Sequence, residues 1–282
     1  MRLRTLPVSV AGVLTAIGYN ILTDTFEAVP AALCMIFALL CQIASNFANE
    51  YFDYKAGRDR TGREGPRRGV TEGDITPRAM LHAVYATLAA ACACGLGLIA
   101  YGGWWLIAIG LAVVAGVFAY SSGPKPLSTV GLGEVAVLLF FGIVPVCLTY
   151  YVQSLSWTWP VFAASVSIGL MGANVLIVNN YRDIPDDAAV GKKTLAVRFG
   201  RRAMIALYRV NAALAAVLML PSWLALEQWL AAVPVIYFCG ALALSSHMSR
   251  LEGASLNPYL GRTSVMMCLY SLIFLLSCTI LH

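Results

Sequence analysis

The chain alternates long apolar stretches with short polar segments from one end to the other. A bilayer core about 30 Å thick needs about 20 apolar residues per helix. Polar breaks mark off stretches of about this length at residues 5–22, 31–52, 79–101, 104–120, 133–151, 159–181, 203–225, 229–246 and 263–281. The pattern predicts an all-α, polytopic integral membrane protein with about nine transmembrane helices.

The composition agrees with a protein dissolved in lipid. Of the 282 residues, 60% are hydrophobic and 12% are charged, whereas soluble domains carry about 25% charged residues. No Ser/Gly-rich linker or low-complexity tract interrupts the pattern, so we expect residues 1–282 to form a single domain. The net charge of +5 fits basic clusters that flank membrane spans. We therefore predict a lipid bilayer and no nucleic acid as partner, and leave the oligomeric state open.

The connections between the expected helices alternate between long and short. The long ones cover about residues 53–78, 121–132, 182–202 and 247–262. A cytoplasmic amino terminus places all four on the cytoplasmic side. All 19 Lys and Arg residues then fall at that terminus, in these loops or at their edges, as the positive-inside rule requires. We predict a multi-pass protein of the cell membrane whose active site faces the cytoplasm.

Two similar polar motifs occur where expected helices enter long loops. The first contains Asn49 and Asp53, and the second contains Asn179, Asp183 and Asp187. Residues four apart lie on one face of a helix, so each motif directs an amide and a carboxylate the same way. Acids at helix ends often only cap the helix or pair with nearby cations. Two copies on one side of the membrane favour function instead, because ionisable groups at membrane depth are costly.

Carboxylates beside basic loops suit a diphosphate held through Mg²⁺, the expected cofactor. Mg²⁺ prefers oxygen ligands and often links acids to phosphates, while basic side chains neutralise the departing diphosphate. The apolar helices indicate a substrate with a hydrophobic tail. Aromatic faces can stabilise a nearby cation, and tyrosines flank the motifs at Tyr51, Tyr54, Tyr120 and Tyr181, although Tyr is also enriched at membrane interfaces. No histidine base is expected, since His82, His247 and His282 lie outside both motifs.

These segments resemble the UbiA superfamily of membrane prenyltransferases, and within it the 1,4-dihydroxy-2-naphthoate polyprenyltransferase branch. The most specific match is NNYRDIPDDAAVGKKTLAVRFG at residues 179–200, and further matches lie at residues 49–59, 65–70, 120–127 and 131–134. The resemblance implies transfer of a polyprenyl chain from polyprenyl diphosphate to an aromatic acid. For this branch the acid is dihydroxynaphthoate, and the reaction releases carbon dioxide and diphosphate to give demethylmenaquinol for menaquinone biosynthesis.

The resemblance also implies residue roles. Asp53 and Asp183 are the expected catalytic acids, and the expected metal site comprises Asn49, Asp53, Asp59, Asn179, Asp183 and Asp187. The expected diphosphate-binding cations are Lys55, Lys125, Arg182, Lys192 and Arg198. The expected contacts to the carbocation or acceptor are Tyr51, Tyr120 and Tyr181. Residue 57 is glycine where the commonest superfamily motif has its second acid, so a direct metal contact from Asp59 stays open.

Three alternatives remain at this point. Another member of the superfamily would use a different aromatic acceptor. A transporter would also carry acids near a helical cavity, but usually at the bilayer midplane on broken helices. A CDP-alcohol phosphotransferase would need a D-G-x-x-A-R motif, which the sequence lacks. The prenyl chain length is not predicted, because tunnel-lining side chains look like any other apolar residue of a span.

Overall fold

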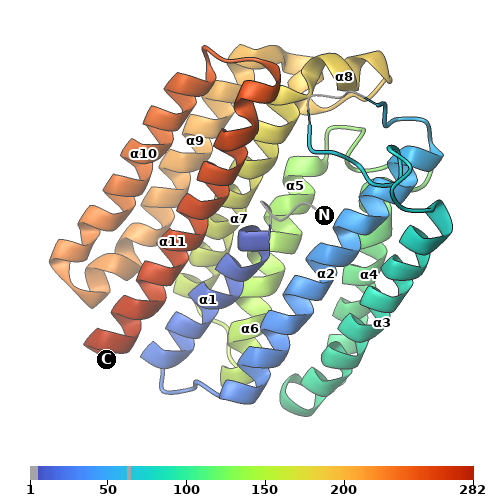
Figure 1. The fold of residues 1–282 in the computed structure, drawn as a ribbon. Helices are drawn as coiled ribbons and strands as arrows, with labels where there is room; N and C mark the ends of the chain where they lie inside the picture. The colour runs from blue at the N-terminus through green and yellow to red at the C-terminus, as the bar shows by residue number, and fades with distance from the viewer. Residues whose placement is uncertain (1–5, 62–64) are drawn as a thin grey trace.

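The computed structural model describes residues 6–61 and 65–282, and helices dominate this part of the chain. Its long helical segments form one bundle (Figure 1) and comprise α1 Leu6–Leu22, α2 Ala28–Lys55, α3 Pro77–Gly102, α4 Leu106–Ser121, α5 Gly133–Val137 continued by η2 Leu138–Ile143 and α6 Val144–Ser154, α7 Trp159–Arg182, α9 Leu195–Leu226, α10 Ala232–Met248 and α11 Asn257–Leu281. Shorter elements are α8 Ile184–Ala189, η3 Gln228–Ala231 and η4 Gly253–Leu256. The expected all-α class is confirmed.

Each predicted span coincides with one of these segments. In the described residues, seven segments are long and apolar enough to cross a membrane, and α1 and α4 are shorter apolar helices. The chain is therefore a multi-pass membrane protein. That α1 and α4 also span the bilayer stays a prediction.

Several helices extend further than their apolar stretches. α2 continues past residue 52 to Lys55, and α9 begins at Leu195 rather than residue 203. The side chain of Thr194 caps the start of α9 by accepting a hydrogen bond from the Val197 amide, and Gly200, with φ of 75°, interrupts the first turns. Hydropathy marks the bilayer core, whereas caps and glycines set the helix ends.

The long connections gather at one end of the bundle. In Figure 1 the loop after α2, the α4–α5 connection, α8 and the α10–α11 connection lie at the upper end, and short turns occupy the other. The predicted alternation of long and short connections is confirmed. Which side of the membrane this end faces stays a prediction. Arg2, Arg4 and Arg63, which contributed to the charge pattern, lie outside the described residues.

Helix α7 is the central element that carries the second motif. It is the most buried candidate span, and it packs against the π-helical segment η2 at very short range. A Cβ atom on Gly142 of η2 would lie 2.4 Å from the Gly169 Cα of α7, so only glycine permits this approach. A π-turn widens the helix locally. Phe140 and Phe141, which precede Gly142 in η2, line the cavity described below.

Candidate active site

The first motif lies on the last turns of α2, where Asn49 is held by two neighbours. Its carboxamide oxygen accepts a hydrogen bond from Arg68 Nη2 at 2.9 Å. Its Nδ2 donates to the hydroxyl of Ser121, at the end of α4, at 3.1 Å. Asn49 thereby fixes the loop after α2 and the end of α4 around the motif.

Asp53, one turn later, is surrounded by cations. Its residue is 1% exposed, and its carboxylate lies 3.1 Å from Arg58 Nε, 3.6 Å from Lys192 Nζ and 3.9 Å from Arg68 Nη2. Arg58 also donates to the backbone carbonyl of Ser121 at 2.9 Å. Three positive charges thus surround this buried carboxylate.

The second motif lies at the end of α7 and is ordered by Arg182. This guanidinium donates to both oxygens of Asp183 at 2.7 and 2.8 Å and to Asn179 Oδ1 at 2.9 Å. It also donates to Asn257 Oδ1, at the start of α11, at 2.8 Å. Arg182 was expected to bind diphosphate, but it is 2% exposed and holds the motif's own side chains. A direct contact between Arg182 and diphosphate stays a prediction.

Asp187 lies in α8, whereas Asp183 stands in the turn between α7 and α8. α7 ends at Arg182 and α8 begins at Ile184, so the helix breaks at Asp183, within the second motif. The physical reason is Pro185, which has no N–H for a helical hydrogen bond and crowds the preceding turn. The Asp187 amide still donates to the Asp183 carbonyl at 2.8 Å, so both carboxylates stay at the same corner.

Lys192 joins the two motifs. Its ammonium lies 3.6 Å from Asp53 Oδ2 and 3.2 Å from Asp187 Oδ1, so acids from the two halves of the chain share one cation. The expected proximity of the two motifs is confirmed. Lys192 is the one predicted diphosphate-binding cation that contacts both motifs within the described residues.

Asp59 and three predicted cations lie around this centre rather than in it. Asp59 follows the end of α2, and its buried carboxylate lies 3.4 Å from Arg68 Nε. Lys55 is exposed, with Nζ 6.0 Å from the centre of the Tyr51 ring. Arg198 donates to the Val130 carbonyl at 2.9 Å and so tethers the α4–α5 loop. Lys125 is exposed in that same loop. Among the described contacts, Lys55, Lys125 and Arg198 show no ion pair with the motif acids.

Only one of the three expected aromatic contacts lines the cavity. Tyr120, near the end of α4, is part of the wall. Tyr181 is 1% exposed within the main core, where the Arg201 guanidinium carbon lies 5.2 Å from its ring centre. The ring of Tyr51 packs against Phe52, with centres 5.1 Å apart.

Several contributors were missed as site residues. Arg58 and Arg68 are nearest neighbours of the first motif, and both lie in or beside segments that carried the family resemblance. Glu134 accepts a hydrogen bond from Asn180 Nδ2 at 2.9 Å, which ties α5 to α7 beside the second motif. Their charge and their position within the matching segments were the only signals that the sequence offered.

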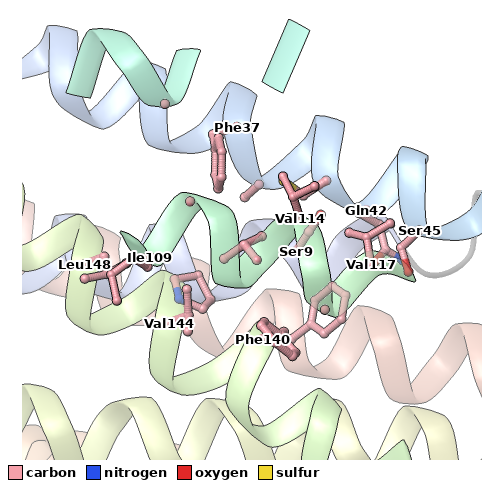
Figure 2. A pocket seen from close by; sticks show the side chains of 18 of the residues that line it. Ser9, Phe37, Gln42, Ser45, Ile109, Val114, Val117, Phe140, Val144 and Leu148 are labelled. Carbon is pink, nitrogen blue, oxygen red and sulfur yellow. The ribbon is translucent and has the colours of Figure 1, made fainter. Parts of the chain in front are cut away.

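A cavity of about 340 Å³ extends from the two motif amides into the bundle. Asn49, Asn179 and Tyr120 line it near the acids, while Leu98, Leu106 and Val152 line its apolar part. Figure 2 shows Phe37 of α2 on one side and Phe140 on the other. A cavity of this kind can hold a hydrophobic chain with its polar head at the motifs.

The donor set consists of hard oxygen ligands. Among the described residues, no group of three or more His, Cys, Asp or Glu side chains is arranged to hold a metal ion. Mg²⁺ usually binds through one or two carboxylates together with phosphate oxygens and water, rather than in an all-protein cage. The oxygen atoms of the two motifs fit that mode, with a diphosphate as the shared ligand.

The chain is similar to known prenyltransferases over most of its length. Residues 5–257 match the model of the UbiA prenyltransferase family. The 1,4-dihydroxy-2-naphthoate octaprenyltransferase of Mycobacterium tuberculosis is 36% identical over 96% of this chain and 92% of its own. The enzyme of the same name from Escherichia coli K12 is 35% identical over 71% of this chain and 67% of its own.

Solved structures share the fold. A UbiA homolog from Archaeoglobus fulgidus bound to DMAPP and Mg²⁺ has a TM-score of 0.66 at 16% identity, covering 97% of this chain and 98% of its own. The apo structure of a UbiA homolog from Aeropyrum pernix K1 has a TM-score of 0.66 at 14% identity, covering 99% and 98%. At these identities the likeness concerns the fold alone.

Proposed function

Because the chain belongs to the UbiA prenyltransferase family, we propose that it transfers a polyprenyl chain from polyprenyl diphosphate to 1,4-dihydroxy-2-naphthoate. The reaction releases carbon dioxide and diphosphate and gives demethylmenaquinol for menaquinone biosynthesis. The acceptor follows from the curated relatives that are 35–36% identical over most of the chain. The observation that carries the proposal is the meeting of two Asn/Asp motifs, through Lys192, beside an apolar cavity.

The two motifs hold the diphosphate head. Carboxylates of Asp53, Asp183 and Asp187, with the amides of Asn49 and Asn179, supply the oxygen ligands for Mg²⁺. When bound, Mg²⁺ neutralises phosphate charge and makes diphosphate a better leaving group. Lys192 is the cation placed to contact phosphate oxygens directly, because it already lies between the motifs. Asp59 acts through Arg68, which it contacts, and not as a metal ligand.

The apolar cavity holds the prenyl tail and keeps water from the reacting carbon. The bond between the first prenyl carbon and the diphosphate oxygen breaks, and the ring carbon that carries the carboxylate forms the new C–C bond. The carboxylate then leaves as carbon dioxide, and the electron pair of the broken bond restores the aromatic ring. Water in the same place would capture the allylic cation, so exclusion of water protects the product. Tyr120, on the cavity wall, offers its ring face to that cation.

The described chain works as one domain, with its loop-rich end toward the cytoplasm. Elements from both ends of the chain interlock, since the rings of Tyr19 in α1 and Phe274 in α11 lie 4.9 Å apart. Arg182 links α7 to α11 beside the site. The concentration of basic loops at the site end supports the cytoplasmic orientation.

Product analysis tests the proposed function. Purified protein in lipid, supplied with Mg²⁺, polyprenyl diphosphate and a panel of aromatic acids, should prenylate dihydroxynaphthoate, and the lipid product should lack the carboxyl carbon by mass. Asp183→Ala should reduce the rate by about 10²–10³-fold, the scale expected for loss of charge stabilisation. Asp74→Ala is the control, because Asp74 is an exposed acid paired with Arg67. Preference for another acid would refute the acceptor, and full activity of a folded Asp183→Ala protein would refute the site.

A further inference from the structure

The α2 wall of the cavity carries a polar stripe. We define this stripe by the cavity-lining residues Gln42, Ser45, Asn46 and Asn49. Their spacing of three and four residues places them on one helix face, and Asp53 continues the same face at the diphosphate end. Away from the acids that face becomes small and apolar at Cys41, Ala38 and Cys34, which also line the cavity. Figure 2 shows Gln42 and Ser45 near one end of the pocket and Ile109 and Leu148 near the other.

Binding of a prenyl tail does not explain this polar stripe. An isoprenoid chain has no hydrogen-bonding group, and a buried polar group without a partner is unfavourable. Asn49 is satisfied by Arg68 and Ser121. Asn46, one turn deeper, is different, because its Nδ2 is closed to solvent and has no hydrogen-bond partner in the described part of the chain. The stripe therefore suits a second ligand that carries polar groups into the apolar cavity.

The stripe also selects the kind of polar group. None of the described residues that line the cavity is charged, and a buried ion without a charged partner is strongly unfavourable. The carboxylate of an aromatic acid would therefore lie at the Asn49 end of the stripe, where Arg68 contacts Asn49, and the rest of the stripe would meet uncharged groups. Amides and hydroxyls match neutral hydroxyl groups, which both donate and accept hydrogen bonds. Because the stripe begins at Asn49, a ring bound along it would lie beside the diphosphate end of the prenyl chain.

We infer that Ser45 and Asn46, with Gln42 next along the helix, bind the ring hydroxyls of the aromatic acceptor and so determine acceptor specificity. This inference rests on the proposed function and deepens it, since nothing in the two Asn/Asp motifs explains how a dihydroxy ring is recognised. The deep apolar wall then serves the prenyl tail, and the polar stripe serves the other substrate. The two substrates meet at Asn49.

The test compares an acceptor with an inhibitor that lacks one of its hydroxyls, in wild type, Asn46→Leu and Ser45→Ala. The quantity measured is the ratio of the KM for 1,4-dihydroxy-2-naphthoate to the inhibition constant of 1-hydroxy-2-naphthoate. Loss of one hydrogen bond should weaken the dihydroxy preference by about 3- to 10-fold, with the KM for polyprenyl diphosphate unchanged. Comparing the ratio between enzymes cancels the intrinsic difference between the two rings. Asn46→Leu should keep its thermal stability, because the amide nitrogen that it removes has no partner.

Ile109→Ala is the matched control from the apolar part of the cavity. It should raise the KM for polyprenyl diphosphate and leave the acceptor ratio unchanged. An unchanged ratio in folded Asn46→Leu and Ser45→Ala overturns the inference. A rise in the polyprenyl diphosphate KM alone, as for Ile109→Ala, also overturns it, since the stripe would then serve the tail. Wild-type protein that forms no product from dihydroxynaphthoate refutes the proposed function itself, which is a separate outcome.

Discussion

Asp53→Asn is expected to destabilise the fold as well as stop the reaction. The residue is 1% exposed, and its carboxylate lies within 4 Å of three cations, Arg58, Arg68 and Lys192. The neutral amide keeps the shape of the side chain but leaves these cations facing one another without a counter-charge. Removing one partner of a buried ion pair costs about 3–5 kcal/mol. That is a large share of a typical unfolding free energy of about 5–15 kcal/mol.

The assay is thermal or denaturant unfolding of the purified protein in detergent, with Asp74→Asn as the control. Asp74 has the shorter ion pair, 2.8 Å from Arg67 Nη2, against 3.1 Å for the nearest cation of Asp53. Its side chain is 49% exposed, however, and that of Arg67 is 68% exposed. Water and salt screen such a pair. If distance alone set the strength of an ion pair, Asp74→Asn would lose more stability. If burial sets it, Asp53→Asn loses more.

The double variant Asp53→Asn/Lys192→Met tests whether repulsion among the cations causes the loss of stability. If repulsion among the cations causes the loss, adding Lys192→Met to Asp53→Asn should restore part of the lost stability without restoring activity. The Lys192 ammonium lies between Asp53 and Asp187, and methionine keeps most of its length without the charge. Wild-type stability of Asp53→Asn, or a double variant less stable than the single one, would show that the electrostatic reasoning is wrong.

Three further predictions concern the diphosphate site, the packing of α7 and the orientation in the membrane. Lys192→Met alone should raise the KM for polyprenyl diphosphate by about tenfold or more, because a hydrogen bond to a charged group contributes about 1.5–3 kcal/mol. An unchanged KM in steady-state kinetics would contradict the proposed contact between Lys192 and phosphate. Gly142→Ala should lower the unfolding temperature, since its Cβ would lie 2.4 Å from an α7 backbone atom and overpacking costs about 1–3 kcal/mol. An unfolding temperature equal to that of wild type would contradict the close packing of η2 on α7. A single cysteine at Trp157, in a chain whose eight cysteines are replaced, should react with an impermeant thiol reagent in intact cells. A cysteine at Lys125 should react only after permeabilisation, and the opposite pattern reverses the proposed orientation.

The helix interiors were predictable because hydropathy is a local property. The positions of Asn49 and Asp53 on one face followed from helix geometry, and the structure bears this out. The predicted end of the sixth span at residue 181 agrees with the end of α7 at Arg182. The short helix α8 that follows was not predicted, because a proline such as Pro185 near a helix end is compatible with either a kink or a new helix. The start of α9 depends on the cap at Thr194, which hydropathy does not report.

The roles of single cations were not predictable from their positions. Both Arg182 and Lys192 lie close in the sequence to an acid of the second motif, Arg182 next to Asp183 and Lys192 five residues after Asp187. The first is directed into the protein toward Asn179 and Asn257, whereas the second lies between the two motifs. Tyr181 likewise turns into the core. Which face of a helix end meets a ligand depends on packing among distant segments, and a charge pattern contains no such information.

Helix α2 shows that departures from an apolar pattern deserve the same weight as a recognised motif. Two of its asparagines, residues 46 and 49, stand one turn apart in a span where each polar side chain is costly. Contacts separate them, since Asn49 is satisfied by Arg68 and Ser121 while the Nδ2 of Asn46 has no partner in the described structure. Because the protein supplies no partner for this buried amide nitrogen, a ligand is expected to supply one. The chemistry of the diphosphate end is shared with other prenyl transfers, so recognition of one particular ring has to come from positions such as Asn46.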